Sequence, residues 1–260
     1  MKFLYRGSAV GFGGQMTRPV VDAPPAQAAT TLPTVGGYAS ALVQDYVYRY
    51  GGAELVSFRA ASSQVVGNAD PDGRVHSTLV SCRVEGLRVL GDLITADAVV
   101  GQLTSHHPMD RSGSLPMLPE CSGFWNLRIQ GRPLDPKMHP LLLEKATKPE
   151  VDKVCRELRF DGQTARAGDP TVFSIFDERS LPRERKVPFR GGLSIGPWDL
   201  KEAKIESGWR IDIPGFGKVY LGEYLVFEDH RVLMMMRLEL GSPAEGLLAL
   251  GVVEGNGRPV

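Results

Sequence analysis

The sequence has few cysteines, and the three it has lie far apart. Cys82, Cys121 and Cys155 form no CxxC pair, which excludes a zinc ribbon and a thioredoxin-like redox motif. An odd number of widely spaced cysteines is not typical of a disulfide framework either. We therefore expect three buried or incidental thiols, because free cysteine behaves as a small core residue.

Long apolar runs are also missing. No segment approaches the roughly 18 consecutive apolar residues of a membrane-spanning helix, and the residues after Met1 lack the continuous apolar stretch of a signal peptide. As written, the sequence predicts a cytoplasmic protein without a membrane span. Export by another route would instead place it outside the cell or in an assembled structure.

Neither sign of charge is in excess, because 30 basic and 30 acidic residues cancel. The absence of a basic excess argues against nucleic acid or an anionic membrane as a partner. A net charge near zero also removes long-range repulsion between copies. Self-association, with the protein itself as partner, would meet little electrostatic resistance.

Glycine and proline are abundant instead, with 30 and 19 residues spread between apolar segments. This spacing is typical of many short strands joined by tight turns. We predict a mainly β fold, an antiparallel sandwich or barrel with one short helix in a charged insert. Residues 1–40 are expected to form an extended Gly/Pro/Ala-rich arm with one short strand. Residues 41–260 form a single β-rich domain, with the helical and loop insert at about 136–205.

Two hairpins are expected. In the first, strands over 55–66 and 75–84 flank the turn-forming residues 68–73, where Pro71 fixes φ and Gly73 can take a positive φ. In the second, strands over 218–227 and 231–240 flank residues 228–230. The run Met234-Met-Met236 predicts that the last strand is apolar on both faces.

The helix is expected over residues 148–159. Thr147 and Glu150 have the spacing of a capping box, and Pro149 lies in the first turn. Apolar residues recur at the helical spacing of i, i+3, i+4 and i+7 from Val151 to Leu158.

One pentapeptide matches a catalytic motif. Gly192-Leu-Ser-Ile-Gly196 fits the Gly-x-Ser-x-Gly pattern of a nucleophile elbow, with Ser194 as nucleophile and His230 as the only later histidine. Such a serine must lie between a strand and a helix, whereas Pro197 follows at once and the chain lacks alternating strands and helices. We therefore favour a non-catalytic interpretation of Ser194.

Other candidate ligands have simpler explanations. His106 and His107, with Asp110 nearby, could bind one metal only on an irregular loop, because neighbouring residues of a strand face opposite ways. Asp70 and Asp72 resemble the start of a calcium loop but fit a turn better. Residues 11–14 lack the spacing of a nucleotide-binding glycine loop. We predict no catalytic, cofactor-binding or metal site.

Several segments resemble the bacterial choice-of-anchor P family of β-rich surface proteins. The resemblance lies in residues 84–100, 124–134, 213–223 and 234–240. It implies an antiparallel β-rich fold, an extracellular location and a non-catalytic surface or structural role. The chain departs from the family pattern in lacking a signal peptide and an anchor, and in carrying the charged insert.

These observations favour a non-catalytic structural or self-assembling protein that acts through homo-oligomeric β-rich contacts. The alternative is a binding module for a carbohydrate or another surface ligand, in which Trp125, Trp198 and Trp209 would offer stacking surfaces. A serine hydrolase that uses Ser194 is the third and least favoured possibility.

Overall fold

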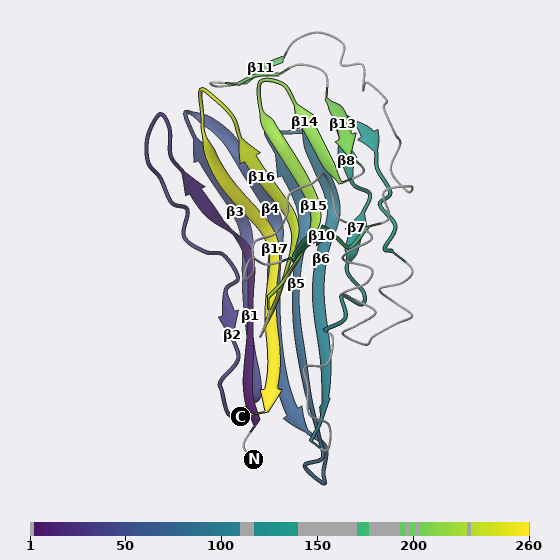
Figure 1. Ribbon diagram of the computed structural model, residues 1–260. Coiled ribbons are helices and arrows are strands. Elements are labelled where there is room, and N and C mark those ends of the chain that lie inside the picture. The colour runs from purple at the N-terminus through teal and green to yellow at the C-terminus, as the bar shows by residue number, and fades with distance from the viewer. Residues whose placement is uncertain are drawn as a thin grey trace.

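The structure, a computed structural model, describes residues 3–109, 117–139, 171–176, 193–195, 198–200, 203–207, 209–227 and 230–259. These residues contain no helix, and their strands form two antiparallel sheets that pack face to face (Figure 1). The mainly β prediction is confirmed, and of the two architectures it allowed, the structure shows the sandwich. The expected helix over 148–159 lies outside the described residues.

The first sheet has the strand order β13-β14-β15-β16-β17-β1-β2, and β10 pairs with β15 beside this path. Its strands are β1 (Phe3–Met16), β2 (Thr30–Thr31), β10 (Thr171–Ser174), β13 (Lys204–Ser207), β14 (Arg210–Ile213), β15 (Gly217–Val226), β16 (Arg231–Leu240) and β17 (Gly246–Pro259). β15 and β16 are the second expected hairpin.

The second sheet has the order β3-β4-β5-β6-β8-β9, and β7 pairs with β6 beside it. Its strands are β3 (Gly37–Tyr50), β4 (Ala53–Ala69), β5 (Val75–Val89), β6 (Ile94–Pro108), β7 (Gly123–Trp125), β8 (Arg128–Ile129) and β9 (Arg132–Pro133). β4 and β5 are the first expected hairpin. A separate pair consists of β11 (Leu193–Ile195) and β12 (Trp198–Leu200).

The N-terminal residues belong to the sandwich, so the prediction of an arm over 1–40 is wrong. β1 pairs with β17 from Phe3 opposite Pro259 to Met16 opposite Gly246. The following segment returns beside β1, with bridges between Phe12 and Gln27 and between Thr30 and Ala9. Proline and glycine in this segment suggested a loose arm, but its backbone hydrogen bonds run to β1. Both chain ends lie at the same end of the sandwich (Figure 1).

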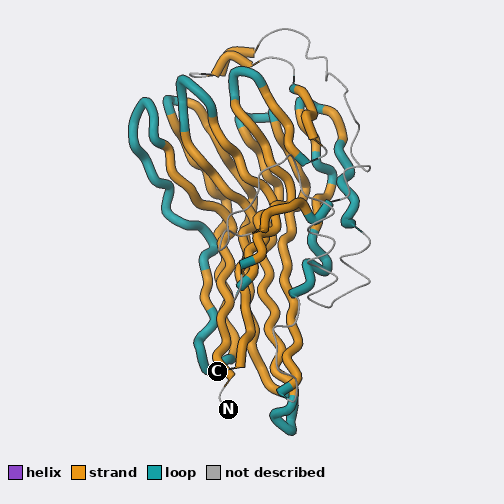
Figure 2. The backbone as a smooth tube through the Cα atoms, in the orientation of Figure 1, coloured by secondary structure: helices purple, strands orange, loops and turns teal. Residues whose placement is uncertain are grey.

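One transverse row interrupts the strand pairing in each sheet. In the second sheet this row consists of one residue from each of four neighbouring strands: Asp45, Arg59, Gly86 and Asp97. Regular strand pairs continue on both sides of the row. Asp45 and Gly86, on alternate strands, have positive φ values of 52° and 64°. A left-handed residue within a strand bends it and changes which face the following side chains occupy. The long strands accordingly change direction about halfway along their length (Figure 2).

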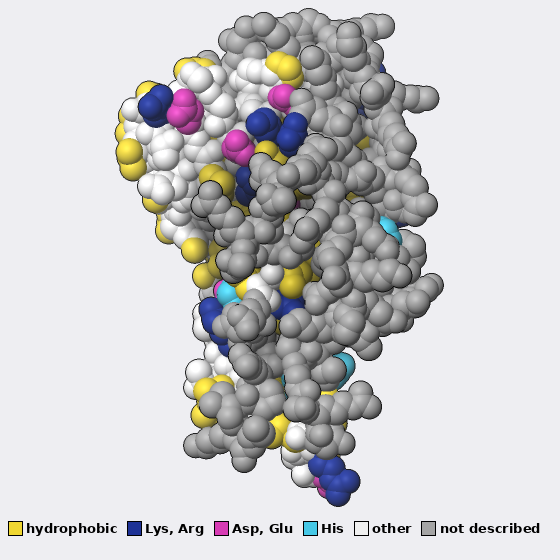
Figure 3. All heavy atoms as spheres, in the orientation of Figure 1, with side chains coloured by type: hydrophobic (Ala, Val, Ile, Leu, Met, Phe, Trp, Pro, Cys, Tyr) yellow, Lys and Arg dark blue, Asp and Glu magenta, His cyan; other side chains and the backbone are white. Residues whose placement is uncertain are grey.

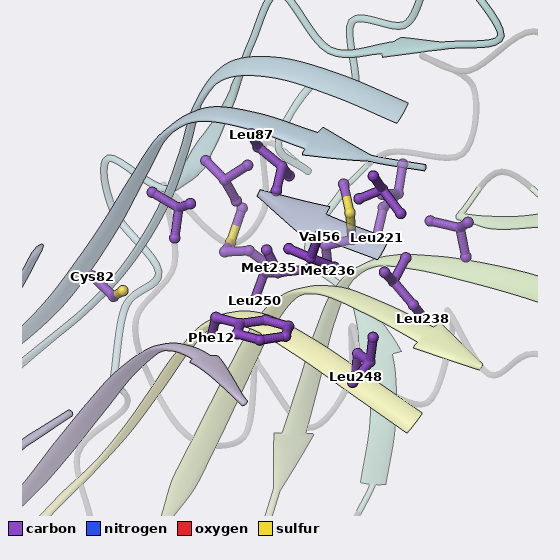
Figure 4. Close-up of a cluster of buried hydrophobic side chains, with 14 of the residues drawn as sticks. Phe12, Val56, Cys82, Leu87, Leu221, Met235, Met236, Leu238, Leu248 and Leu250 are labelled. Atoms are coloured by element: carbon purple, nitrogen blue, oxygen red, sulfur yellow. The ribbon is translucent and has the colours of Figure 1, made fainter. Parts of the chain in front are cut away.

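The corresponding row of the first sheet runs through Gly11, Met235, Gly222 and Gly251. Gly222 and Gly251 again have positive φ values, of 64° and 63°. The inward-facing positions shift by one residue at this row. As a result, neighbouring residues such as Met235 and Met236 are both fully buried and both belong to the core between the sheets (Figure 4).

This shift corrects our interpretation of the methionine run. Met235 and Met236 are buried because the alternation changes between them, whereas Met234 is half-buried. The strand is therefore not apolar on both faces over its whole length. None of the described residues forms a helix that is long and apolar enough to cross a membrane.

Candidate functional site

Ser194 lies in the middle of β11, directly opposite Asp199 of β12. β11 pairs antiparallel with β12, the next strand in the chain, whereas a nucleophile elbow requires a helix after the serine. His230 lies in the link between β15 and β16, where its ring stacks on Phe227 with 4.1 Å between the ring centroids. The backbone around Ser194 thus lacks the geometry that the motif requires.

His106 and His107 are neighbours on β6, and they face opposite sides of the sheet as expected for a strand. His107 is 2% exposed, whereas His106 is exposed and its Nδ1 lies 2.8 Å from Oγ of Ser77. Asp110 lies outside the described residues. Within the described ranges, no group of three or more His, Cys, Asp or Glu side chains could hold a metal ion.

The strand register instead places His107 directly opposite His76 of β5. The Tyr5 hydroxyl lies 2.7 Å from Nδ1 of His76, and the Phe3 ring stacks on the His76 ring at 4.3 Å. Nε2 of His107 is buried without a hydrogen-bond partner in the described part of the chain. Burial, with a smaller contribution from the charges of His106 and His76, lowers the pKa of His107 to about 4. The His107 imidazole is therefore buried and neutral.

Asp70 and Asp72 belong to the turn between β4 and β5. One carboxylate oxygen of Asp70 accepts hydrogen bonds from the backbone N–H groups of Arg74 at 2.6 Å and Val75 at 3.0 Å. Gly73 takes the expected positive φ, at 67°. The Asp70 carboxylate thus closes the turn, which confirms the turn interpretation.

The tryptophans do not form one stacking platform among the described side chains. Trp125 is 48% exposed and pairs with Ala98 at the side of the second sheet. Trp209 lies just before β14 of the first sheet, and its ring centroid is 5.3 Å from that of Tyr220. Trp198 is in β12, and its side chain lies outside the described part.

The remaining motifs have structural places. Residues 11–14 continue β1 as a strand and form no phosphate-binding turn. Cys82 is 1% exposed in the core, Cys121 is exposed, and both are free thiols. Cys155 lies outside the described residues. None of these features forms a chemical site in the described structure.

The most distinctive surface is the open edge of the second sheet. Among the described residues the 14-residue strand β3 pairs with β4 alone, and none of its other backbone groups bonds to another segment. A strand edge of this length presents a row of free N–H and C=O groups. Such a row is a template for pairing with another strand.

The other edges carry protection that β3 lacks. β2 and β9 are each two residues long, and β13 contains Lys204 and Glu206. Proteins commonly use short strands, charges and proline to prevent pairing at an edge. In β3, the run from residue 37 to residue 44 has no charged residue and no proline. Within the described sheets, these first eight residues of β3 form the longest edge segment without charge or proline.

Exposed apolar side chains gather around this edge. Of the ten large hydrophobic side chains that are exposed in the described structure, six lie on β3 or beside it: Val20, Val21, Val35, Tyr38, Leu42 and Val47. The backbone N–H of Val20 donates to the Tyr50 hydroxyl at the end of β3, which places the loop after β1 at the same edge. In Figure 3 the upper left margin shows hydrophobic and uncharged atoms around one basic and one acidic side chain. Clustered exposed apolar residues mark interaction surfaces.

The neutral surface extends from the edge strand β3 across the outer face of β4, β5 and β6. Its cross-strand rows are Tyr38–Val66–Leu79–Thr104, Ser40–Gln64–Ser81–Gln102 and Leu42–Ser62–Arg83–Val100. Just beyond them, Glu85 accepts hydrogen bonds from Arg83 at 2.6 Å and Arg59 at 2.5 Å. The Arg83 hydrogen bond is the main cause of the lowered pKa of Glu85. Glu85 therefore offsets part of the positive charge of these two arginines.

We refer to the exposed edge of β3 and these three rows as the β3 surface. The balanced charge of the whole chain gave no indication of this surface. The distribution of lysine did, because residues 3–109 contain none. Lysine is depleted at protein interfaces and is a common protection of strand edges. Its absence over more than a hundred residues could have indicated an interface.

Comparisons with known proteins give a family for the chain. No curated protein and no solved structure matches it. One family model, described as a domain of unknown function (DUF8256), matches residues 3–178. The match starts at β1 and includes the whole second sheet and β10. Because it extends over more than half of the sequence, the chain belongs to this family, DUF8256.

Proposed function

We propose that this is a non-catalytic structural protein that assembles with copies of itself through the β3 surface. The observation that carries the proposal is the long open edge of β3, whose first eight residues have neither charge nor proline. The exposed side chains of Tyr38 and Leu42, at 62% and 63%, stand on the same outer face. Pairing would satisfy the free backbone groups and bury these side chains.

Electrostatics support a second copy as the partner. A surface that meets its own copy places like charges near one another, which is destabilising unless the surface is neutral. The run from residue 37 to residue 44 has no charge, and Glu85 offsets part of the charge of Arg59 and Arg83. The β3 surface therefore suits self-association better than it suits a strongly charged partner.

The test is light scattering coupled to size-exclusion chromatography over a range of concentrations, with negative-stain imaging of the same fractions. We expect oligomers or regular particles for the wild type, and monomers for Leu42→Lys, because association would bury the new charge in an apolar contact. Leu247→Lys is the matched control, since Leu247 is also exposed, at 44%, but lies on β17. A wild type that stays monomeric at high concentration would reject the proposal.

A second candidate is a carbohydrate-binding module. The row Ser40–Gln64–Ser81–Gln102 offers neutral hydrogen-bonding groups beside the exposed Tyr38 ring, a combination that suits a sugar. A glycan array on the wild type and on Tyr38→Ala tests this candidate. Binding that Tyr38→Ala abolishes would support it, and an array without signal for the wild type would exclude it.

A further inference from the structure

The part of β3 that can accept another strand has definite limits. Gly36 and Gly37 have φ values of 90° and 110° at its start, and Asp45 has a φ of 52° at its end. Between them, residues 38–44 form regular strand with outward-facing side chains at Tyr38, Ser40, Leu42 and Gln44. A partner strand in register can therefore pair over about seven residues before the chain bends.

Two identical strands pair antiparallel about a two-fold axis that is perpendicular to the sheet. Residues directly opposite each other then point to the same face, so outward residues meet outward residues of the other copy. This condition holds only when one residue on the axis faces the same residue of the other copy. An axis midway between two successive residues would pair outward residues with inward ones. For the segment 38–44, an axis at Ala41 pairs all seven residues, and an axis at Ser40 or at Leu42 pairs five of them.

Side chains decide among these three registers. With the axis at Ala41, Tyr38 would lie opposite Gln44, and Ser40 opposite Leu42 of the other copy. With the axis at Leu42, the two Leu42 side chains would meet once, and Tyr38 would have no partner within the segment. With the axis at Ser40, Tyr38 meets Leu42 twice and the two Ser40 hydroxyls face each other. Aromatic and aliphatic residues directly opposite each other stabilise a sheet. The axis at Ser40 gives two apolar pairs on the outer face, whereas the axis at Leu42 gives one and the axis at Ala41 gives none.

We propose that two copies join their second sheets through β3 of each, antiparallel, with Ser40 on the two-fold axis and Tyr38 packed on Leu42 of the other copy. This inference rests on the self-association proposed above and specifies its partner and register. A specific dimer buries about 800 Å² on each partner, more than one strand edge offers. The exposed Val35, just before the start of β3, adds to the contact, whereas Val20 and Val21 lie at the Tyr50 end, beyond the bend.

Cysteine cross-linking tests the register. In a background with Cys121→Ser and Cys155→Ser, the Ser40→Cys variant places two thiols opposite each other in the dimer. We expect mild oxidation, or a short bismaleimide, to convert most of the dimer into a covalent dimer on a non-reducing gel. Ser62→Cys, on β4 one strand further from the edge and on the same face, is the matched control and should give only traces.

The outcomes separate this inference from the proposed function. A dimer in solution whose Ala41→Cys variant cross-links more than Ser40→Cys would overturn the register and leave self-association standing. A dimer that cross-links at none of these positions would place the interface elsewhere and overturn the inference. A monomeric wild type would overturn both. The double variant Tyr38→Cys/Leu42→Cys checks the same register independently, since it should cross-link between copies.

Discussion

His107 faces His76 directly across β6 and β5, at the end of the sandwich where Phe3 and Tyr5 cover the pair. Buried among these groups, the His107 imidazole is neutral in the folded protein, with its pKa lowered to about 4 from an ordinary value of 6.5. Stability should therefore depend on this residue in mild acid.

The unfolded chain binds a proton at His107 below about pH 6.5, whereas the folded chain does so only near pH 4. The contribution of the neutral imidazole is complete above pH 6.5 and is lost as the pH falls toward 4. At about 1.4 kcal/mol per pKa unit, the full loss is about 3 kcal/mol. Urea unfolding between pH 7 and 4 should show this decline for the wild type and a flatter curve for His107→Leu. His106→Gln is the exposed control and should keep the slope; parallel curves for all three would refute the prediction.

The buried ion pair between Glu223 and Arg237 should be the most sensitive charged contact of the described structure. Nη2 of Arg237 donates to Glu223 at 2.8 Å, and the guanidinium lies 3.8 Å from the Tyr220 ring centroid. The side chains are 4% and 18% exposed. Glu223→Gln removes the buried carboxylate and leaves Arg237 only its pair with Glu239, which is 46% exposed and lies at 3.2 Å. We expect a loss of about 3 kcal/mol in the free energy of unfolding.

The matched control for this pair is Glu245→Gln. Glu245 lies 3.5 Å from Arg18 with both side chains exposed, at 37% and 71%. An exposed pair of this kind contributes about 0–1 kcal/mol. Denaturant unfolding of both variants measures the difference, and equal small losses would show that the buried pair is not a main contribution to stability.

The interrupted row of the first sheet predicts a large effect at Gly222. Its φ is +64°, and an added Cβ would lie 2.5 Å from the Phe176 ring. Gly222→Ala should therefore lose more than about 1 kcal/mol, since the left-handed conformation alone costs a non-glycine residue about that much. Gly13→Ala is the control, because its Cβ would meet nothing closer than 3.8 Å. Similar unfolding midpoints for the two variants would contradict the role of this row.

These features also show what the sequence could and could not predict. The turn at Asp70 and both hairpins were predictable, because turn residues and alternation act locally. The shift at Met235 was not, because it depends on the left-handed conformation of Gly222 and Gly251 across neighbouring strands. The pair His76–His107 required the strand register, and the open edge of β3 required the strand order. The resemblance to choice-of-anchor P proteins and the extracellular location that it implies stay predictions.

The two described cysteines should differ sharply in reactivity. Cys82 is 1% exposed between the sheets, and burial raises the pKa of its thiol to about 12. Because the thiolate is the reactive form, Cys82 should resist iodoacetamide at pH 8. Cys121 is exposed and should be modified in the folded protein.

Peptide mapping by mass spectrometry after brief labelling distinguishes the two thiols. Labelling in guanidinium is the control, since both thiols then become accessible, and Cys121→Ser should remove the label from its peptide in the folded protein. Cys82 lies in the half of the sandwich between the interrupted row and the His76–His107 pair, so its labelling reports opening of the two sheets there. Folded protein that labels Cys82 as fast as Cys121 would mean that the sheets separate readily, and a rigid strand edge at β3 would then lose its support.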